Sequence, residues 1–176
     1  MFEIQPMSPE TYRQQTRRAT LIVAGLFVVL AMLTSTFSVQ VFGEPGGDNF
    51  RWNLIGVLAG LVLTVAVVRI SLWRQAWMAP AVYGWRLKRS LMRVTNVMHD
   101  VKAGVAVGDP SAMKLLRFYH LGVTQMYQLD GNLSDLSQMV REIDQHREAM
   151  EAQGLDIEQN RLDPAWLEAV KRFAKK

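Results

Sequence analysis

The sequence predicts an all-α protein in which a transmembrane helical hairpin is followed by a small cytoplasmic helical bundle. The first observation is a pair of uncharged apolar segments, residues 19–43 and 52–68, on either side of a short polar turn. The second is that apolar residues beyond residue 83 recur at spacings of three and four, which is typical of amphipathic helices. The third is that no segment alternates with the period of two expected for strands.

The first apolar segment is long enough to cross a lipid bilayer. Leu, Ile, Val or Phe occupy 13 of the 22 positions between Leu21 and Phe42. At about 1.5 Å per residue, a helix of this length extends about 33 Å, slightly more than the ~30 Å hydrocarbon core. A buried helical hairpin in a soluble protein is the alternative. We favour a membrane span because 25 consecutive residues without a charge are rare in a core helix.

The second apolar segment is shorter, and we expect its flanking residues to complete the span. Residues 52–68 extend about 25 Å as a helix, and the stems of Arg51 and Arg69 can carry their charges to the headgroups. Amphipathic indole rings favour the membrane interface. The predicted interfacial aromatic residues are Trp52, Trp73 and Trp77.

Composition divides the chain into an arm, a hairpin, an elbow and a bundle. Charged residues concentrate after Leu72, and Pro80 is expected to break or kink the helix that follows the second span. The predicted parts are a cytoplasmic N-terminal arm (1–18), a two-span transmembrane hairpin (19–72, with spans at about 20–42 and 52–72 and a loop at 43–51), an interfacial elbow (73–83) and a cytoplasmic helical bundle (84–176).

Basic residues near the spans predict that both termini lie in the cytoplasm. The glycine-rich loop at 43–51 carries one basic residue, Arg51, and should lie on the outer side. A secretory signal is the competing interpretation, because Arg17 and Arg18 precede the first span. However, the apolar segment is longer than a typical signal core, and no small-x-small cleavage site follows it.

The segment between Asn49 and His99 contains no acidic residue, and the chain carries a net charge of +4. We hypothesise that its basic residues contact anionic lipid headgroups and orient the bundle. A solvated basic face is the alternative, and nucleic acid is not a predicted partner because a lipid surface lies only a few residues away. The predicted membrane-surface residues are Arg69, Arg74, Arg86, Lys88, Arg89 and Arg93.

Small and polar residues within the spans suggest where helices pack. Gly56 and Gly60 form a small-xxx-small pair, which serves either the packing of the chain's own hairpin or a dimer contact. The outer half of the first span is polar, with Thr34, Ser38 and Gln40. Serine and threonine can bond back to their own helix, so this polarity is either harmless or a face that lines a pore or binds a partner helix.

Four amphipathic helices are predicted in the bundle, at about 81–105, 110–129, 133–153 and from Pro164 onwards. Asp109 and Asp163, each followed by proline, are expected N-caps, and Asn132 with Asp135 is expected to open the third helix. The predicted apolar stripes are Gly84, Leu87, Leu91, Val94, Met98, Val101 and Val105 on the first helix, and Leu133, Leu136, Val140, Ile143 and Met150 on the third, with Arg147 completing the latter.

No catalytic, metal or cofactor site is predicted. The chain has no cysteine, and its Glu-x-x-x-His sequence at Glu142 and His146 occurs once and differs from the paired Glu-x-x-His of di-iron bundles. We therefore expect His146 to be a surface polar residue and His120 to be a satisfied core or boundary residue. The turn near Gly108 lacks the Gly-Lys-Ser/Thr sequence of a phosphate-binding loop.

The chain combines two predicted spans and a polar N-terminal arm with the sequence Leu116-Arg117-Phe118-Tyr119 ahead of Leu129-Asp130. In these features it resembles a family of small proteobacterial inner-membrane proteins of unknown function. The resemblance implies a bacterial inner membrane and adds no site residue.

We expect a non-enzymatic adaptor or accessory subunit that docks a protein partner, or copies of itself, through its bundle. A subunit of a small homo-oligomeric channel is the alternative, supported only by the polar outer half of the first span. An enzyme with a site that the sequence hides is less favoured.

Overall fold

A computed structural model describes residues 2–174, and for Leu133 and Asp135 it describes the backbone alone. The described residues form helices and no strand, which confirms the all-α fold. They fall into two compact units, Gln14–Val82 and a unit that joins Met1–Arg13 to Tyr83–Lys176. The main helices are α1 (Pro9–Phe42), α2 (Phe50–Val67), α3 (Ala79–Thr95), α4 (Met98–Ala106), α5 (Pro110–Asp130), α6 (Leu133–Ala152) and α7 (Pro164–Val170), with short helical segments η1 (Val68–Leu72), η2 (Ala76–Met78) and η3 (Lys171–Phe173).

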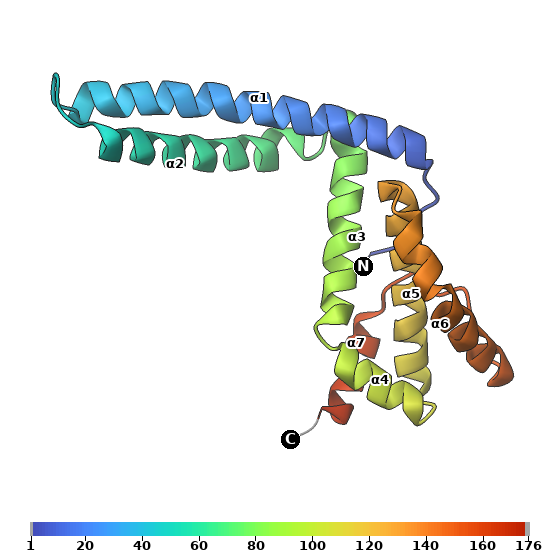
Figure 1. The fold of residues 1–176 in the computed structure, drawn as a ribbon. Helices are drawn as coiled ribbons and strands as arrows, with labels where there is room; N and C mark the ends of the chain where they lie inside the picture. The colour runs from blue at the N-terminus through green and yellow to red at the C-terminus, as the bar shows by residue number, and fades with distance from the viewer. Residues whose placement is uncertain (1, 175–176) are drawn as a thin grey trace. The chain divides into compact units, whose positions relative to one another are not determined.

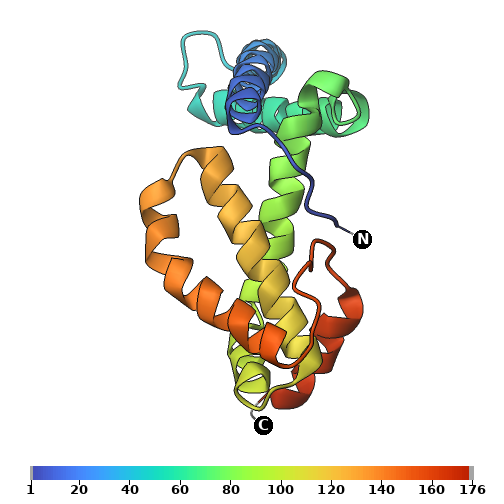
Figure 2. The same ribbon diagram turned by 90° about the vertical axis from the view of Figure 1, so that its right-hand side faces the viewer.

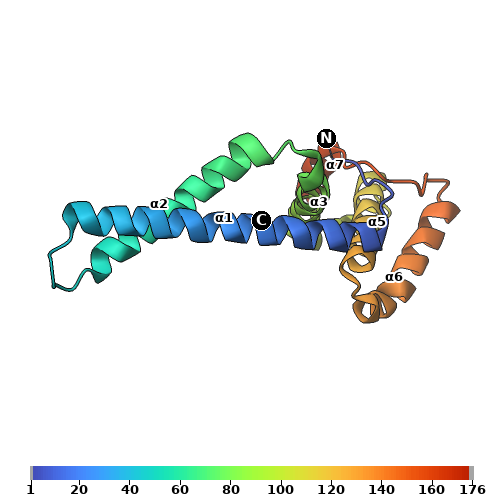
Figure 3. The same cartoon turned by 90° about the horizontal axis from the view of Figure 1, so that it is seen from above.

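The first unit is an antiparallel hairpin of α1 and α2, which run side by side and cross at an angle (Figures 1 and 3). Two helical stretches, Pro9–Phe42 and Phe50–Leu72, are long and apolar enough to cross a membrane. In each stretch, an apolar segment of 18 residues is largely unburied: only 11% of it in the first and 17% in the second is buried within the structure. A core helix of a soluble protein would be mostly buried, so this outward apolar surface favours a lipid environment.

The turn between these helices is closed by one side chain. The Asn49 amide nitrogen donates to the Glu44 carbonyl oxygen at 3.0 Å, and its amide oxygen accepts from the Glu44 N–H at 2.9 Å. Gly46 has φ +76°, a left-handed conformation that glycine adopts without steric cost. The result is a tight connection where the sequence predicts a glycine-rich loop.

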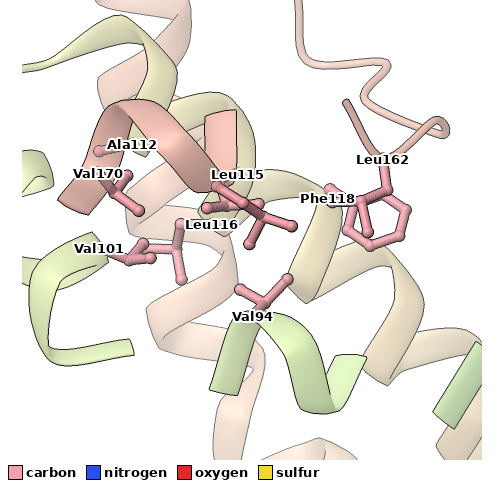
Figure 4. Packing of buried hydrophobic residues seen from close by; sticks show 9 residues of the cluster. Val94, Val101, Ala112, Leu115, Leu116, Phe118, Leu162 and Val170 are labelled. Atoms are coloured by element: carbon pink, nitrogen blue, oxygen red, sulfur yellow. The ribbon is translucent and has the colours of Figure 1, made fainter. Parts of the chain in front are cut away.

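The second unit contains the helical bundle, in which α5 contacts α4, α6 and α7. Figure 2 shows α6 and α7 on different sides of α5. The core gathers apolar side chains from α3, α4, α5, α7 and the preceding loop, as Figure 4 shows. Its buried residues are Val94, Val101, Ala112, Leu115, Leu116, Phe118, Leu162, Leu167 and Val170.

The predicted helix ends of the bundle are largely confirmed. The carboxylate of Asp109 accepts from the Ala112 N–H at 3.0 Å and that of Asp163 accepts from the Ala165 N–H at 2.8 Å, so both residues act as N-caps. Gly131 follows α5 in the left-handed conformation, with φ +77°. The predicted pairing of Asn132 with Asp135 depends on a side chain outside the described residues, as does the stripe position of Leu133.

The single helix predicted at 81–105 is wrong, because the structure divides it into α3 and α4 at residues 96–97. The Thr95 hydroxyl donates to the Leu91 carbonyl oxygen at 3.1 Å, a bond that tends to bend helices. Asn96 and Val97 follow, and both have low helix propensity. The apolar stripe nevertheless persists through the break, since Val94 and Val101 are both fully buried.

Candidate functional site

The glycine pair of α2 lies against α1 within the chain's own hairpin. A Cβ atom at Gly56 would lie 2.7 Å from the Ser35 nitrogen, and one at Gly60 would lie 2.6 Å from Ala31 Cα. Both separations are shorter than real Cβ contacts, so the two backbones approach closely only because side chains are absent there. Of the two roles open from the sequence, hairpin packing is the one that this geometry describes.

Two hydroxyl groups of the first span contact α2. Thr34 Oγ1 lies 2.6 Å from the Gly56 carbonyl oxygen, and Ser35 Oγ donates to Asn53 Oδ1 at 2.8 Å. Ser38 is buried, and its hydroxyl has no hydrogen-bond partner among the described residues. Gln40 remains exposed. Thr34 and Ser35, in the polar half of the first span, are therefore in the contact between the two helices.

The predicted interfacial tryptophans make three different contacts. The Trp52 ring stacks on Phe42 with 5.0 Å between centroids, next to the turn of the hairpin. The Arg69 guanidinium lies 4.6 Å from the centre of the Trp73 ring. Trp77 is partly buried against a small apolar cluster that includes Met78.

The second half of the basic segment forms an exposed face on α3. Its arginines stand three and four residues apart, and two apolar side chains, Trp85 (44% exposed) and Met92 (63% exposed), lie among them. The Arg89 guanidinium lies 5.1 Å from the centre of the Trp85 ring. We call this surface the basic face, and it consists of Trp85, Arg86, Arg89, Met92 and Arg93.

The remaining predicted membrane-surface residues lie elsewhere. Lys88 forms an ion pair with Asp130 at the end of α5, with 3.0 Å between Nζ and Oδ2. Arg69 and Arg74 are exposed and belong to the first unit. The structure thus gathers Arg86, Arg89 and Arg93 on one surface and gives Lys88 a partner within the bundle.

A buried polar cluster joins α5, α6 and the loop after α6. The rings of His120 and His146 meet edge to face, with 5.3 Å between their centroids. His146 Nε2 lies 2.9 Å from the Met113 carbonyl oxygen, and Arg117 Nε donates to the Ile157 carbonyl oxygen at 3.0 Å. His120 Nδ1 has no hydrogen-bond partner among the described residues.

Burial disfavours the charged form of both histidines. Desolvation, reinforced by His146 and Arg117, lowers the pKa of His120 from 6.5 to about 3. Desolvation also lowers the pKa of His146, although its hydrogen bond with Met113 opposes the shift. Within residues 2–174, no group of three or more His, Cys, Asp or Glu side chains is placed to hold a metal ion.

The expectation that His146 is a surface residue is wrong, because the residue is only 7% exposed. His146 stands four residues before Met150, which is completely buried, and residues at this spacing share a helix face. The predicted stripe instead completed its spacing with Arg147. The packing face of α6 therefore includes position 146, one residue earlier than the sequence pattern indicated.

Residues 2–5 lie in an extended conformation on the bundle, within the part of the chain that is predicted as a polar N-terminal arm. We call this segment the strap. It pairs antiparallel with the loop after α6 through a bridge between Glu3 and Arg161, and Figure 2 shows the two segments side by side. The sequence carries one faint signal for it, the alternation of apolar Phe2 and Ile4 with polar Glu3, but four residues are too few to establish a period.

One protein family matches most of the chain. A sequence model of the family described as "Protein of unknown function (DUF3087)" matches residues 2–167. The chain belongs to the DUF3087 family. Searches of curated proteins and of solved structures gave no match. The DUF3087 match begins in the strap and ends in α7, so it covers the hairpin, the basic face and the buried polar cluster.

Proposed function

We propose that this DUF3087 protein is a non-enzymatic adaptor or accessory subunit of the bacterial inner membrane, with two spans and a cytoplasmic bundle that docks a protein partner. One observation supports the topology on which the proposal depends. The strap precedes the hairpin, the bundle follows it, and the two are hydrogen-bonded in a single unit. Segments on both sides of the hairpin therefore share one compartment, as an even number of spans requires.

The distribution of basic residues supports a cytoplasmic side for that unit. Arg13, Arg17 and Arg18 precede the first span, whereas the turn between the spans carries only Arg51. Short flanks rich in Lys and Arg remain in the cytoplasm during insertion. We further propose that the basic face of α3 contacts anionic headgroups, since it combines three cations with an exposed indole ring.

Reporter fusions are expected to place the turn and the bundle on opposite sides of the membrane. A reporter active only in the periplasm should be active when fused at Gly46 and silent when fused after the bundle. A fluorescent protein that matures only in the cytoplasm should give the reverse result at both positions. Periplasmic activity after the bundle would contradict the topology and with it the proposed contact with cytoplasmic lipid.

Chemical crosslinking in native membranes, followed by purification and mass spectrometry, tests the adaptor role. We expect crosslinks between lysines of the bundle and a different protein that copurifies in a fixed ratio. A closed ring of this chain alone, together with conductance in planar bilayers, would contradict the adaptor and support a channel. We do not propose the channel, because Thr34 and Ser35 bond within the hairpin.

A further inference from the structure

We propose that the bundle contains a binding site for an extended peptide, and that the strap occupies it as an intramolecular ligand. The proposal deepens the adaptor role and rests on it for its biological meaning, since it names the chemistry of the docked partner. That partner is a segment with an aromatic and an aliphatic side chain two residues apart and an acidic residue between them.

The site binds the strap mainly through hydrogen bonds between the backbone of the strap and that of the loop after α6. The Ile4 N–H donates to the Asn160 carbonyl oxygen at 2.8 Å, and the Leu162 N–H donates to the Phe2 carbonyl oxygen at 3.0 Å. This is the pairing by which extended peptides add to an exposed strand edge. Because the backbone supplies these bonds, they do not depend on the identity of the peptide's side chains.

Two side chains of the bundle bind the backbone of Gln5, the residue after Ile4. The Gln5 N–H donates to the Tyr83 hydroxyl at 3.1 Å, and the side-chain amide of Gln125 donates to the Gln5 carbonyl oxygen. Tyr83 in turn donates to the Gln125 amide oxygen, which fixes the orientation of both side chains. The N–H and the C=O of Gln5 are thus both bound by side chains that come from α3 and α5.

Alternation along the strap selects side chains. The centroid of the Phe2 ring lies 5.7 Å from that of Tyr83 and 6.4 Å from that of Phe118, and the Phe2 ring meets the Phe118 ring edge to face. Ile4, two residues on, packs against the same core cluster. Glu3 between them is exposed and pairs with Arg161, with 3.1 Å between the charged atoms. This arrangement gives the aromatic, acidic, aliphatic pattern.

The walls of the site are anchored without the strap. Arg117 holds the loop after α6 through the Ile157 carbonyl oxygen, and Leu162 is buried in the core cluster. Asp163, immediately after it, caps α7. If the strap left, the free groups of Asn160 and Leu162 would remain positioned to pair with another peptide.

The strap itself lies at the surface. Among its described residues, Phe2 and Ile4 are partly buried, whereas Glu3 and Gln5 are exposed. Ion pairs between such exposed groups contribute little to stability. The strap is held by backbone hydrogen bonds and by two side chains that are only partly buried. A competing segment can displace a contact of this kind.

Displacement is tested on the full chain in detergent with a fluorescent peptide of the sequence of residues 1–8. The chain has no cysteine, so the double variant E3C/R161C can be oxidised to lock the strap across its bridge pair. We expect the variant F2A/I4A to bind the peptide saturably and at least about tenfold more tightly than the native chain. The locked variant should exclude the peptide, and reduction should restore binding.

Two controls separate recognition from other effects. A peptide in which alanine replaces both Phe2 and Ile4 should not bind, whereas adsorption to the micelle would be equal for the native and locked chains. If F2A/I4A does not fold, E3K loosens the strap by repulsion from Arg161 while leaving the site intact. Equal binding by locked and unlocked chains, or no binding by any loosened variant that is folded, would overturn the proposal. Peptide binding without any crosslinked partner in membranes would instead refute only the adaptor role.

Discussion

Replacing Gly56 with alanine is expected to destabilise the packing of α1 against α2, whereas the same replacement at Gly25 is not. The new Cβ atom at position 56 would lie 2.7 Å from the Ser35 nitrogen, and both atoms belong to helices that cannot yield locally. Overpacking of this kind costs about 1–3 kcal/mol, and sometimes more. If the new methyl group moved the two helices apart, the contact between Thr34 Oγ1 and the Gly56 carbonyl oxygen would also weaken.

Gly25 is the matched control within α1. No described atom lies within 4 Å of a Cβ placed there, apart from its own helix and chain neighbours. Alanine at this position should therefore leave the hairpin as stable as the native chain, or more stable by up to about 1 kcal/mol. Thermal unfolding in detergent, followed by circular dichroism, measures both variants. If G56A changes the oligomeric state but not the unfolding temperature, the pair is a dimer contact.

The sequence predicts the hairpin and most helix ends because single local features determine them. A long uncharged segment requires only its length to indicate a span, and Asp109 or Asp163 before proline requires only its neighbours to indicate a helix start. The sequence pattern does not reveal the break at residues 96–97. The apolar stripe continues through it to Val101, and periodicity alone does not show that the helix axis changes.

The strap and the buried polar cluster depend on contacts between residues far apart in the chain. Phe2 meets Phe118, and Gln5 meets Tyr83 and Gln125, and nothing in the four-residue strap indicates these partners. The sequence predicts a surface position for His146, because histidine is polar and Arg147 completes the spacing of the apolar stripe. Only the packing of α6 on α5 decides between these two neighbouring positions.

Acidification is expected to destabilise the bundle through His120. The pKa of His120 is about 3 in the folded chain and 6.5 when the residue is exposed, so between these pH values the unfolded chain binds more protons. The free energy of unfolding therefore decreases as the pH falls below 6.5. At pH 4.5 the loss due to His120 should be about 2–3 kcal/mol, at 1.36 kcal/mol per pH unit. The lowered pKa of His146 adds a loss of the same sign.

The variant H120L should lose this part of the pH dependence. Leucine has no proton to bind, and His120 Nδ1 leaves no described hydrogen bond to be broken. The free energy of unfolding at pH 7.5 should change by less than about 1.5 kcal/mol, as is usual for substitutions that preserve core volume. Urea unfolding of the full chain between pH 7.5 and 4.5 should show the native chain losing stability more steeply than H120L. H99Q, which replaces an exposed histidine outside the buried polar cluster, is the matched control variant. Parallel slopes for the native chain and H120L would show that His120 accepts a proton without opening the bundle.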